Sequence, residues 1–217
     1  MRISVITGGP IDDFASYIVR DADLIYACDS GYEFALRNDI KVDHLVGDFD
    51  SLDPELLALA KHRNVPIERY PVEKDQSDTE LVLDIIARDH PDATVDLICP
   101  ASGRLDHVLA NLDCLLKMKK AGISITASDG ITDIIPMTGN DSICIEGINT
   151  SSDIAISIMP RTECTGVTTK GLYYKMEDQT IRPGGSLTLS NKLIEGCDSF
   201  SVSSRSGDIL VIITPAV

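Results

Sequence analysis

The first half of the chain alternates short apolar runs with segments whose apolar residues recur at helical spacing. Continuous apolar runs predict buried strands, and apolar residues three and four positions apart predict helices that pack one face against a sheet. The alternation occurs at least five times, which predicts a mostly parallel sheet with flanking helices, a Rossmann-like α/β domain. The expected strands are residues 2–6, 23–28, 44–46, 66–70 and 93–99.

Capping residues mark the expected starts of two helices. Asp53 stands before Pro54, and an acidic N-cap followed by proline at the first helical position typically begins a helix. Ser77 and Glu80 have the spacing of a capping box, in which each side chain bonds the backbone N–H of the other residue. We therefore expect helices to follow both Asp53 and Ser77.

Beyond residues 138–140 the pattern changes to short alternating runs separated by Gly, Asn and Asp. A succession of such runs is typical of an antiparallel β-sandwich. We therefore expect two domains, an α/β domain at 1–137 and a β-sandwich at 138–217. Strands of the second domain are expected at 142–145, 154–158, 186–190, 199–202 and 209–213.

Composition and charge narrow the classes of partner. The formal net charge of −15 argues against binding to nucleic acid, which needs clusters of Lys and Arg. A cationic small molecule is a more natural partner. The six cysteines form no close pair and no metal-ligand spacing, so free thiols in a cytoplasmic protein are expected. No signal peptide is evident, and no apolar run is long enough to predict a membrane span.

Acidic residues follow three of the predicted strands. Because the carboxyl ends of parallel strands meet at one edge of a sheet, we expect these side chains to lie together where ligands bind. Carboxylates that converge repel one another unless a cation lies between them, and Mg²⁺ takes hard oxygen ligands of this kind. Turn formation alone is the competing interpretation. The acidic residues are Asp29, Asp48, Asp50, Asp75 and Asp78.

Two further turns carry weaker signals. Gly8 and Gly9 follow the first strand, where backbone N–H groups can approach a phosphate, although the turn lacks both common phosphate-binding glycine patterns. Arg104 falls in the first turn of a helix, which is unfavourable for the helix dipole, so a carboxylate or a phosphate is its expected partner. His107 lies in the same turn, and Asn111 lies one turn further on the same face.

Three spaced motifs, at residues 47–51, 74–80 and 103–111, resemble those of the thiamine pyrophosphokinases. Residues 165–172 and 189–191 extend the resemblance into the second half of the chain. Ser77 stands where the family usually has Thr, and the chain has no Trp. The absence of Trp makes the chain similar to the bacterial branch of the family and leaves the aromatic partner of thiamine unassigned.

The resemblance implies transfer of pyrophosphate from ATP to thiamine with release of AMP, by a homodimer whose active sites lie at the subunit interface. It implies an α/β catalytic domain that binds ATP and Mg²⁺ and a β-rich domain that binds thiamine. A compatible mechanism holds Mg²⁺ on Asp48 and Asp50, with Asp29 or Asp75, while Arg104 clamps phosphate. Asp78 is the candidate to hold the thiamine hydroxyl, or to help a metal ion do so.

The residues assigned on this basis fall into three sets. The catalytic set is Asp48, Asp50, Asp75, Asp78 and Arg104. The ATP-binding set is Gly8, Gly9, Asp29, Ser30, Ser51, Arg104, Asp106, His107 and Asn111. The thiamine-binding set is Asp78, Ser190 and Asn191.

Four other functions use similar residues. A related Mg²⁺-dependent pyrophosphokinase could act on another alcohol, such as a hydroxymethylpterin. Metal-dependent phosphatases and sugar-nucleotide transferases also use the Asp-x-Asp pattern of Asp48 and Asp50. A nucleotide-responsive binding module would bind Mg-ATP and form no AMP, but a pure binder has little use for so many converging acids.

Overall fold

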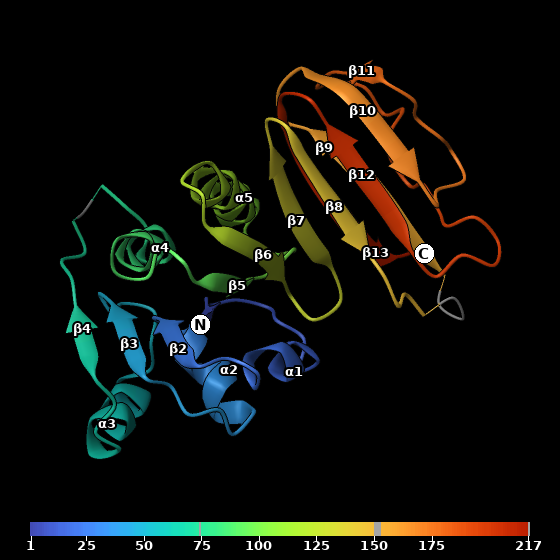
Figure 1. Cartoon of the computed structure of the whole chain (residues 1–217). Coiled ribbons are helices and arrows are strands. Elements are labelled where there is room, and N and C mark those ends of the chain that lie inside the picture. Colours follow the sequence, from blue (N-terminus) through green and yellow to red (C-terminus); the bar gives the residue numbers. More distant parts are fainter. Residues whose placement is uncertain (74, 150–152, 217) are drawn as a thin grey trace. The chain divides into compact units, whose positions relative to one another are not determined.

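The computed structural model describes residues 1–73, 75–149 and 153–216 (Figure 1). The chain divides into two compact units, Met1–Ile131 and Thr132–Val217. The boundary lies six residues before the one expected at 137/138, because the strand that follows Thr132 pairs within the second unit.

The first unit contains one parallel sheet with helices on both faces. Its strands are β1 (Arg2–Ile6), β2 (Leu24–Cys28), β3 (His44–Gly47), β4 (Ile67–Arg69), β5 (Thr94–Ile98) and β6 (Ser124–Ser128). Neighbouring strands pair in the order β4-β3-β2-β1-β5-β6, and every one of these pairings is parallel. The order reverses between β1 and β5, which in open parallel sheets is where ligands bind beyond the strand ends.

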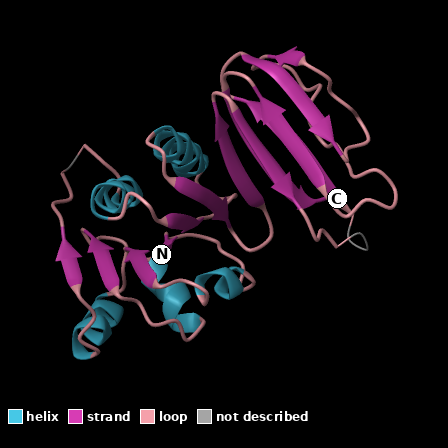
Figure 2. Ribbon diagram, viewed as in Figure 1, coloured by secondary structure: helices cyan, strands magenta, loops and turns pink. Residues whose placement is uncertain are grey.

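Helices cover both faces of this sheet, as expected for a Rossmann-like domain. They are α1 (Ala15–Val19), α2 (Gly31–Arg37), α3 (Pro54–His62), α4 (Asp78–Asp89) and α5 (Leu105–Lys120). Figures 1 and 2 show α1, α2 and α3 on one face and α4 and α5 on the other. The connections after β2, β3, β4 and β5 therefore all open at one edge, which is the edge that carries the predicted acidic residues.

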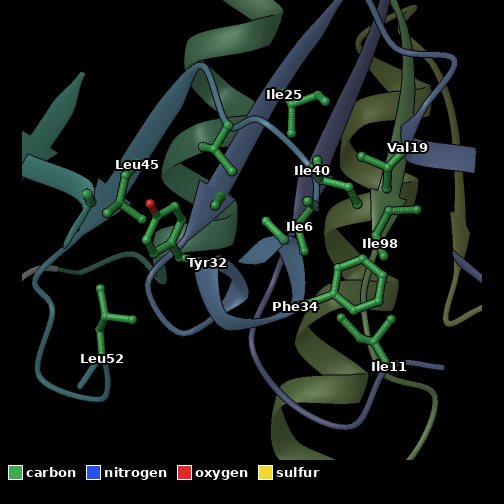
Figure 3. Packing of buried hydrophobic residues seen from close by; sticks show 14 of the residues in the cluster. Ile6, Ile11, Val19, Ile25, Tyr32, Phe34, Ile40, Leu45, Leu52 and Ile98 are labelled. Carbon is green, nitrogen blue, oxygen red and sulfur yellow. The ribbon is translucent and has the colours of Figure 1, made fainter. Parts of the chain in front are cut away.

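A hydrophobic cluster under α1, α2 and α3 holds that edge in place. Figure 3 shows Tyr32 of α2 beside Leu45 of β3, and Phe34 beside Ile11. Gly31 begins α2 against the end of β1, where a Cβ atom would collide with the Ile6 carbonyl oxygen. The close approach of α2 to β1 therefore depends on a residue without a side chain.

Both predicted helix starts are confirmed. The Asp53 carboxylate accepts a hydrogen bond of 2.8 Å from the backbone N–H of Glu55 at the start of α3. Ser77 Oγ accepts one of 3.2 Å from the backbone N–H of Glu80 at the start of α4. The Glu80 carboxylate instead bonds Lys117 Nζ on α5 at 2.9 Å, so the Ser77 half of the expected capping box is formed and Glu80 joins α4 to α5.

The second unit is an antiparallel sandwich, as expected. Its strands are β7 (Asp133–Thr138), β8 (Asp141–Ile145), β9 (Ile154–Pro160), β10 (Cys164–Lys170), β11 (Gln179–Ile181), β12 (Phe200–Ser204) and β13 (Asp208–Pro215). One sheet has the order β7-β13-β9 and the other β11-β10-β12-β8. Apolar residues of both sheets, among them Ile158, Val167, Val202 and Val211, form one buried cluster between them.

One expected strand of this unit is wrong. Residues 186–190 form turns, not a strand, because their alternation of polar and apolar side chains does not follow burial. Leu187 is 82% exposed, and Ser190 has a φ of 52°, in the left-handed region that ends an extended run.

Two remaining expectations concern cysteines and membranes. All six cysteines are free thiols, and four of them are buried. Among the described residues, no helix combines the length and the apolar character needed to cross a bilayer.

Candidate active site

The loop after β3 is anchored by two apolar side chains that flank its polar ones. Phe49 is 7% exposed and Leu52 is 4% exposed, and both belong to the cluster under α2. The Asp48 carboxylate accepts a hydrogen bond of 3.1 Å from the backbone N–H of Asp50. The Asp48 side chain, 9% exposed, is thereby held at the edge of the sheet, whereas Asp50 is exposed to solvent.

Asp29 follows β2 and occupies an unusual backbone conformation. Its φ is 47°, in the left-handed region that few residues other than Gly, Asn and Asp adopt. Its backbone N–H donates to the Val46 carbonyl of β3 at 2.9 Å, and its Oδ2 accepts a hydrogen bond from Ser51 Oγ. Asp29 is therefore tied to β3 and to the loop that carries Asp48.

The position of Asp29 raises the pKa of its carboxyl group. Its Oδ1 atom is buried and has no hydrogen-bond donor among the described residues. Burial raises the pKa of Asp29, and although the Ser51 hydroxyl lowers it, the negative charges of Asp78 and Asp48 raise it further. Such a carboxylate gains most from a cation nearby.

Asp78, the first residue of α4, completes a cluster with Asp29 and Asp48. One carboxylate oxygen from each of the three lies within 4.8 Å of the others. Ser77, the N-cap of α4, sets where the helix begins and hence where Asp78 is placed. This carboxylate cluster, defined here as Asp29, Asp48 and Asp78, joins the ends of β2 and β3 to the start of α4. Asp50 and Asp75, also predicted as metal ligands, are exposed and lie outside it.

The carboxylate cluster suits a divalent cation. Three hard oxygen donors converge, and one of the three carboxylates, that of Asp29, has a buried oxygen that accepts no hydrogen bond within the described residues. Divalent cations such as Mg²⁺ are usually held by one or two carboxylates together with waters and substrate phosphates. The predicted convergence of acids at this edge is thus observed for Asp29, Asp48 and Asp78.

Arg69, the last residue of β4, contacts the same loop and was not among the residues predicted from the sequence. Its Nη2 donates a hydrogen bond of 3.2 Å to the backbone carbonyl of Asp48, and its guanidinium lies 5.9 Å from the centre of the Phe49 ring. In the parallel pairing of β3 and β4, Arg69 is opposite Gly47. The sequence carries no local signal for this contact, which depends on the register between two strands.

The turn after β1 is packed too tightly for any residue but glycine. A Cβ atom on Gly8 would collide with Ser30 Oγ, and one on Gly9, whose φ is 113°, would come within 2.8 Å of Pro100 Cγ. Gly8 thus lies against the start of α2 and Gly9 against the segment after β5. These backbone atoms border the position where the strand order reverses.

The start of α5 presents polar residues at the same edge. Arg104 Nη2 pairs with Asp106 at 2.7 Å, and both side chains are exposed. The predicted carboxylate partner of Arg104 is thus present, and the Arg104 guanidinium lowers the pKa of Asp106. His107 is exposed, whereas Asn111 is buried and hydrogen-bonds the Cys99 thiol, whose pKa burial raises to about 12.

In the second unit, the predicted thiamine-binding residues have different surroundings. Ser190 is exposed, and its backbone N–H donates to Ser157 Oγ at 3.0 Å. Asn191 is buried, with 5% of the residue exposed. Its Nδ2 donates a hydrogen bond to the Tyr174 carbonyl at 2.8 Å, and its Oδ1 accepts one from the Tyr174 N–H at 3.0 Å. Asn191 therefore fixes the backbone of Tyr174, next to the exposed aromatic pair of Tyr173 and Tyr174.

Comparison with known proteins agrees with both units. Residues 15–127 match the family model described as thiamin pyrophosphokinase, catalytic domain, and residues 134–208 match that described as thiamin pyrophosphokinase, vitamin B1 binding domain. The chain is 30% identical to the thiamine pyrophosphokinase of Bacillus subtilis over 203 residues, which cover 92% of each chain.

Solved structures give the same result. The crystal structure of thiamine pyrophosphokinase from Bacillus subtilis is similar to this chain with a TM-score of 0.85 at 26% identity, covering 100% of both chains. That from Geobacillus thermodenitrificans has a TM-score of 0.82 at 26% identity, covering 100% of this chain and 98% of its own. With two matching domains in the same order and a relative aligned over nearly the full length, this chain belongs to the thiamine pyrophosphokinase family.

Proposed function

We propose that the chain transfers the pyrophosphoryl group of ATP to the hydroxyl of thiamine, giving thiamine diphosphate and AMP. Membership of the thiamine pyrophosphokinase family supports the activity. The observation that carries the assignment within this chain is the carboxylate cluster at the carboxyl edge of the parallel sheet. Nothing in the chain favours a hydroxymethylpterin as the acceptor.

The carboxylate cluster is proposed to hold Mg²⁺. The bound ion would neutralise the phosphate oxygens of ATP and so lower the repulsion that an incoming hydroxyl oxygen meets. Asp29 and Asp48 would hold the ion from the ends of β2 and β3, and Asp78 would hold it from the start of α4, since one carboxylate oxygen of each lies within 4.8 Å of the others. Asp50 and Asp75, which are both exposed, stay predictions as further ligands.

The nucleotide is proposed to lie across the point where the strand order reverses. The backbone of Gly8 and Gly9, with Ser30 behind it, lets phosphate oxygens approach the sheet closely. Arg104 can fork onto phosphate oxygens because its planar guanidinium is exposed. On ATP binding, Arg104 would exchange its ion pair with Asp106 for one with a phosphate group. The remaining residues proposed for ATP binding are Ser51, His107 and Asn111.

In the proposed reaction, the thiamine hydroxyl oxygen forms a bond to the β-phosphorus while the bond from that phosphorus to the oxygen it shares with the α-phosphate breaks. AMP leaves with that oxygen. Asp78 is proposed to accept the hydrogen bond of the thiamine hydroxyl and so to orient it, since such transfers depend mostly on positioning and electrostatics. Ser190 and Asn191 are proposed to place thiamine from the second unit, Asn191 by fixing the backbone of Tyr174. We further propose a cytoplasmic homodimer with its active sites at the subunit interface.

The test is to incubate the protein with ATP, Mg²⁺ and thiamine and to resolve the nucleotide and thiamine products, omitting thiamine as the control. AMP and thiamine diphosphate in equal amounts are expected, and only when thiamine is present. ADP with thiamine monophosphate would contradict pyrophosphoryl transfer. AMP formed with a hydroxymethylpterin but not with thiamine would move the assignment to the alternative acceptor.

A further inference from the structure

We propose that Arg69 is a positioning residue that shapes the metal-binding loop after β3, an inference that rests on the proposed function of that loop. The loop places Asp48 by an unusual local conformation. Phe49 has a φ of 63°, a left-handed value that is uncommon for an aromatic residue and costs free energy. Some contact in the folded protein has to offset this cost.

Burial of the Phe49 ring supplies one such contact. Phe49 packs into the cluster that also contains Leu52 and Leu45. The preceding residue, Asp48, lies in the carboxylate cluster, so the placement of Phe49 bears directly on that of Asp48. Burial alone leaves the backbone carbonyl of Asp48 to be fixed by another group.

Arg69 contacts the loop at two points. Its Nη2 donates to the Asp48 carbonyl at 3.2 Å, and its guanidinium lies 5.9 Å from the Phe49 ring centre. Both contacts stabilise the loop and so offset the conformational cost at Phe49, since the hydrogen bond fixes the Asp48 carbonyl and the cation–π contact fixes the Phe49 ring.

The position of Arg69 in the sheet makes both contacts possible. It is opposite Gly47 in the pairing of β4 with β3, and the next residue, Tyr70, donates its N–H to the Gly47 carbonyl at 3.0 Å. Backbone pairing with β4 thus fixes the chain as far as Gly47. The Arg69 side chain adds a contact at the next residue, through its hydrogen bond to the Asp48 carbonyl. Arg69 acts on the metal through Asp48 and not by direct contact.

The inference is tested with Arg69→Met, which removes both contacts and keeps an unbranched stem. The readout is binding of Mn²⁺ alone, followed by the loss of the free-ion electron paramagnetic resonance signal. We expect about five- to tenfold weaker Mn²⁺ binding, which corresponds to loss of about one hydrogen bond. In turnover, the Mg²⁺ concentration for half-maximal rate should rise by a similar factor, with the KM for thiamine unchanged.

Matched variants distinguish a positioning role of Arg69 from a general loss of stability. Arg63→Met is the control, because Arg63 is an exposed arginine at the C-cap of α3 and should bind Mn²⁺ as the wild type does. Arg69→Lys should recover part of the affinity, since an ammonium group can still donate to the carbonyl. Phe49→Leu should also weaken Mn²⁺ binding, because the ring that faces Arg69 is lost.

Two results would overturn the inference. One is Mn²⁺ affinity of folded Arg69→Met within twofold of the wild type, and the other is absence of Mn²⁺ binding by the wild type. A raised KM for ATP at unchanged Mn²⁺ affinity would instead make Arg69 a direct phosphate contact. Because Mn²⁺ binding needs neither thiamine nor turnover, failure of this inference is distinguishable from failure of the proposed function.

Discussion

At the scale of single residues, the carboxylate cluster is the proposed metal site and destabilises the fold. Three acids within 4.8 Å of one another repel when no cation lies between them. Substitutions here should therefore affect stability and activity differently.

Asp48→Asn should remove turnover while leaving the fold intact. The amide keeps the shape of the side chain but lowers the charge that holds the cation, and we expect a loss of more than about 100-fold in kcat/KM, since a metal stabilises the transition state by several kcal/mol. Steady-state kinetics and a thermal melt check this. Asp92→Asn, an exposed acid just before β5, is the control; near-normal activity of Asp48→Asn would remove Asp48 from the site.

The raised pKa of Asp29 predicts a pH-dependent difference in stability. The ordinary value is 3.8, and burial raises it in the fold, so above 3.8 the folded chain binds the proton more tightly than the unfolded chain does. The contribution of Asp29 to stability therefore falls as the pH rises through the raised value. Asp29→Asn, which tolerates the same positive φ, has no such loss.

Without metal, Asp29→Asn should thus be more stable than the wild type at neutral pH. The difference should shrink as the pH falls toward 3.8, where the wild-type carboxyl is protonated in both states. Urea unfolding of both proteins in a chelator, across this range, measures it. An advantage of Asp29→Asn that stays constant with pH would trace to its backbone and not to ionisation.

Most of the residues at this site, but not all, could be predicted from the sequence. Asp29, Asp48 and Asp78 could be predicted to converge because each follows a predicted strand, and parallel strands end at one edge. The choice among five acids could not be predicted, since it depends on the burial of Phe49 and on the start of α4. Arg69 was missed because cross-strand register is not visible in local sequence.

At the scale of elements, helix α4 is both a structural unit and the carrier of a site residue. Its first residue, Asp78, belongs to the carboxylate cluster. The Ser77 cap therefore has a second consequence beyond helix stability, because fraying of the first turn would displace Asp78.

Comparison of Ser77→Ala with Asp53→Ala tests this. Each removes an N-cap side chain whose hydrogen bond is observed, and each should cost about 1 kcal/mol in the free energy of unfolding. Only Ser77→Ala should also lower kcat/KM, since α3 carries no residue of the cluster. Denaturant unfolding and kinetics of both variants suffice; equal kinetic losses would show a general effect of stability.

Element prediction succeeded where capping and burial agreed. Asp53 and Ser77 located α3 and α4 because a cap is a local feature of the chain. The expected strand at 186–190 failed because alternation alone does not establish burial, and Leu187 is 82% exposed. Helical spacing of apolar residues does not establish burial either, because Leu105, the first residue of α5, is 67% exposed.

At the scale of the whole molecule, the large negative net charge affects stability. The chain carries 34 acidic and 19 basic residues, and a large net charge disfavours the compact state through self-repulsion. Salt should therefore stabilise the protein by screening, and a specifically bound divalent cation should stabilise it further.

We expect MgCl₂ to raise the melting temperature more than NaCl at equal ionic strength. A ligand at ten times its Kd adds about 1.4 kcal/mol, and each kcal/mol corresponds to about 2–4 °C for a chain of this size. The excess over NaCl should vanish in Asp48→Asn, whereas the screening effect common to both salts should persist. Differential scanning calorimetry measures both effects, and an excess retained in Asp48→Asn would place Mg²⁺ elsewhere.

The order of strands in the second unit bears on how the protein is made. β13 lies between β7 and β9 and pairs with both, yet both of those strands leave the ribosome before it does. Until β13 arrives, β7 and β9 each present an open edge, which invites pairing with other chains. The first unit, Met1–Ile131, is compact by itself, and we expect it to fold during synthesis. Nascent chains stalled before Asp208 should therefore depend most on chaperones.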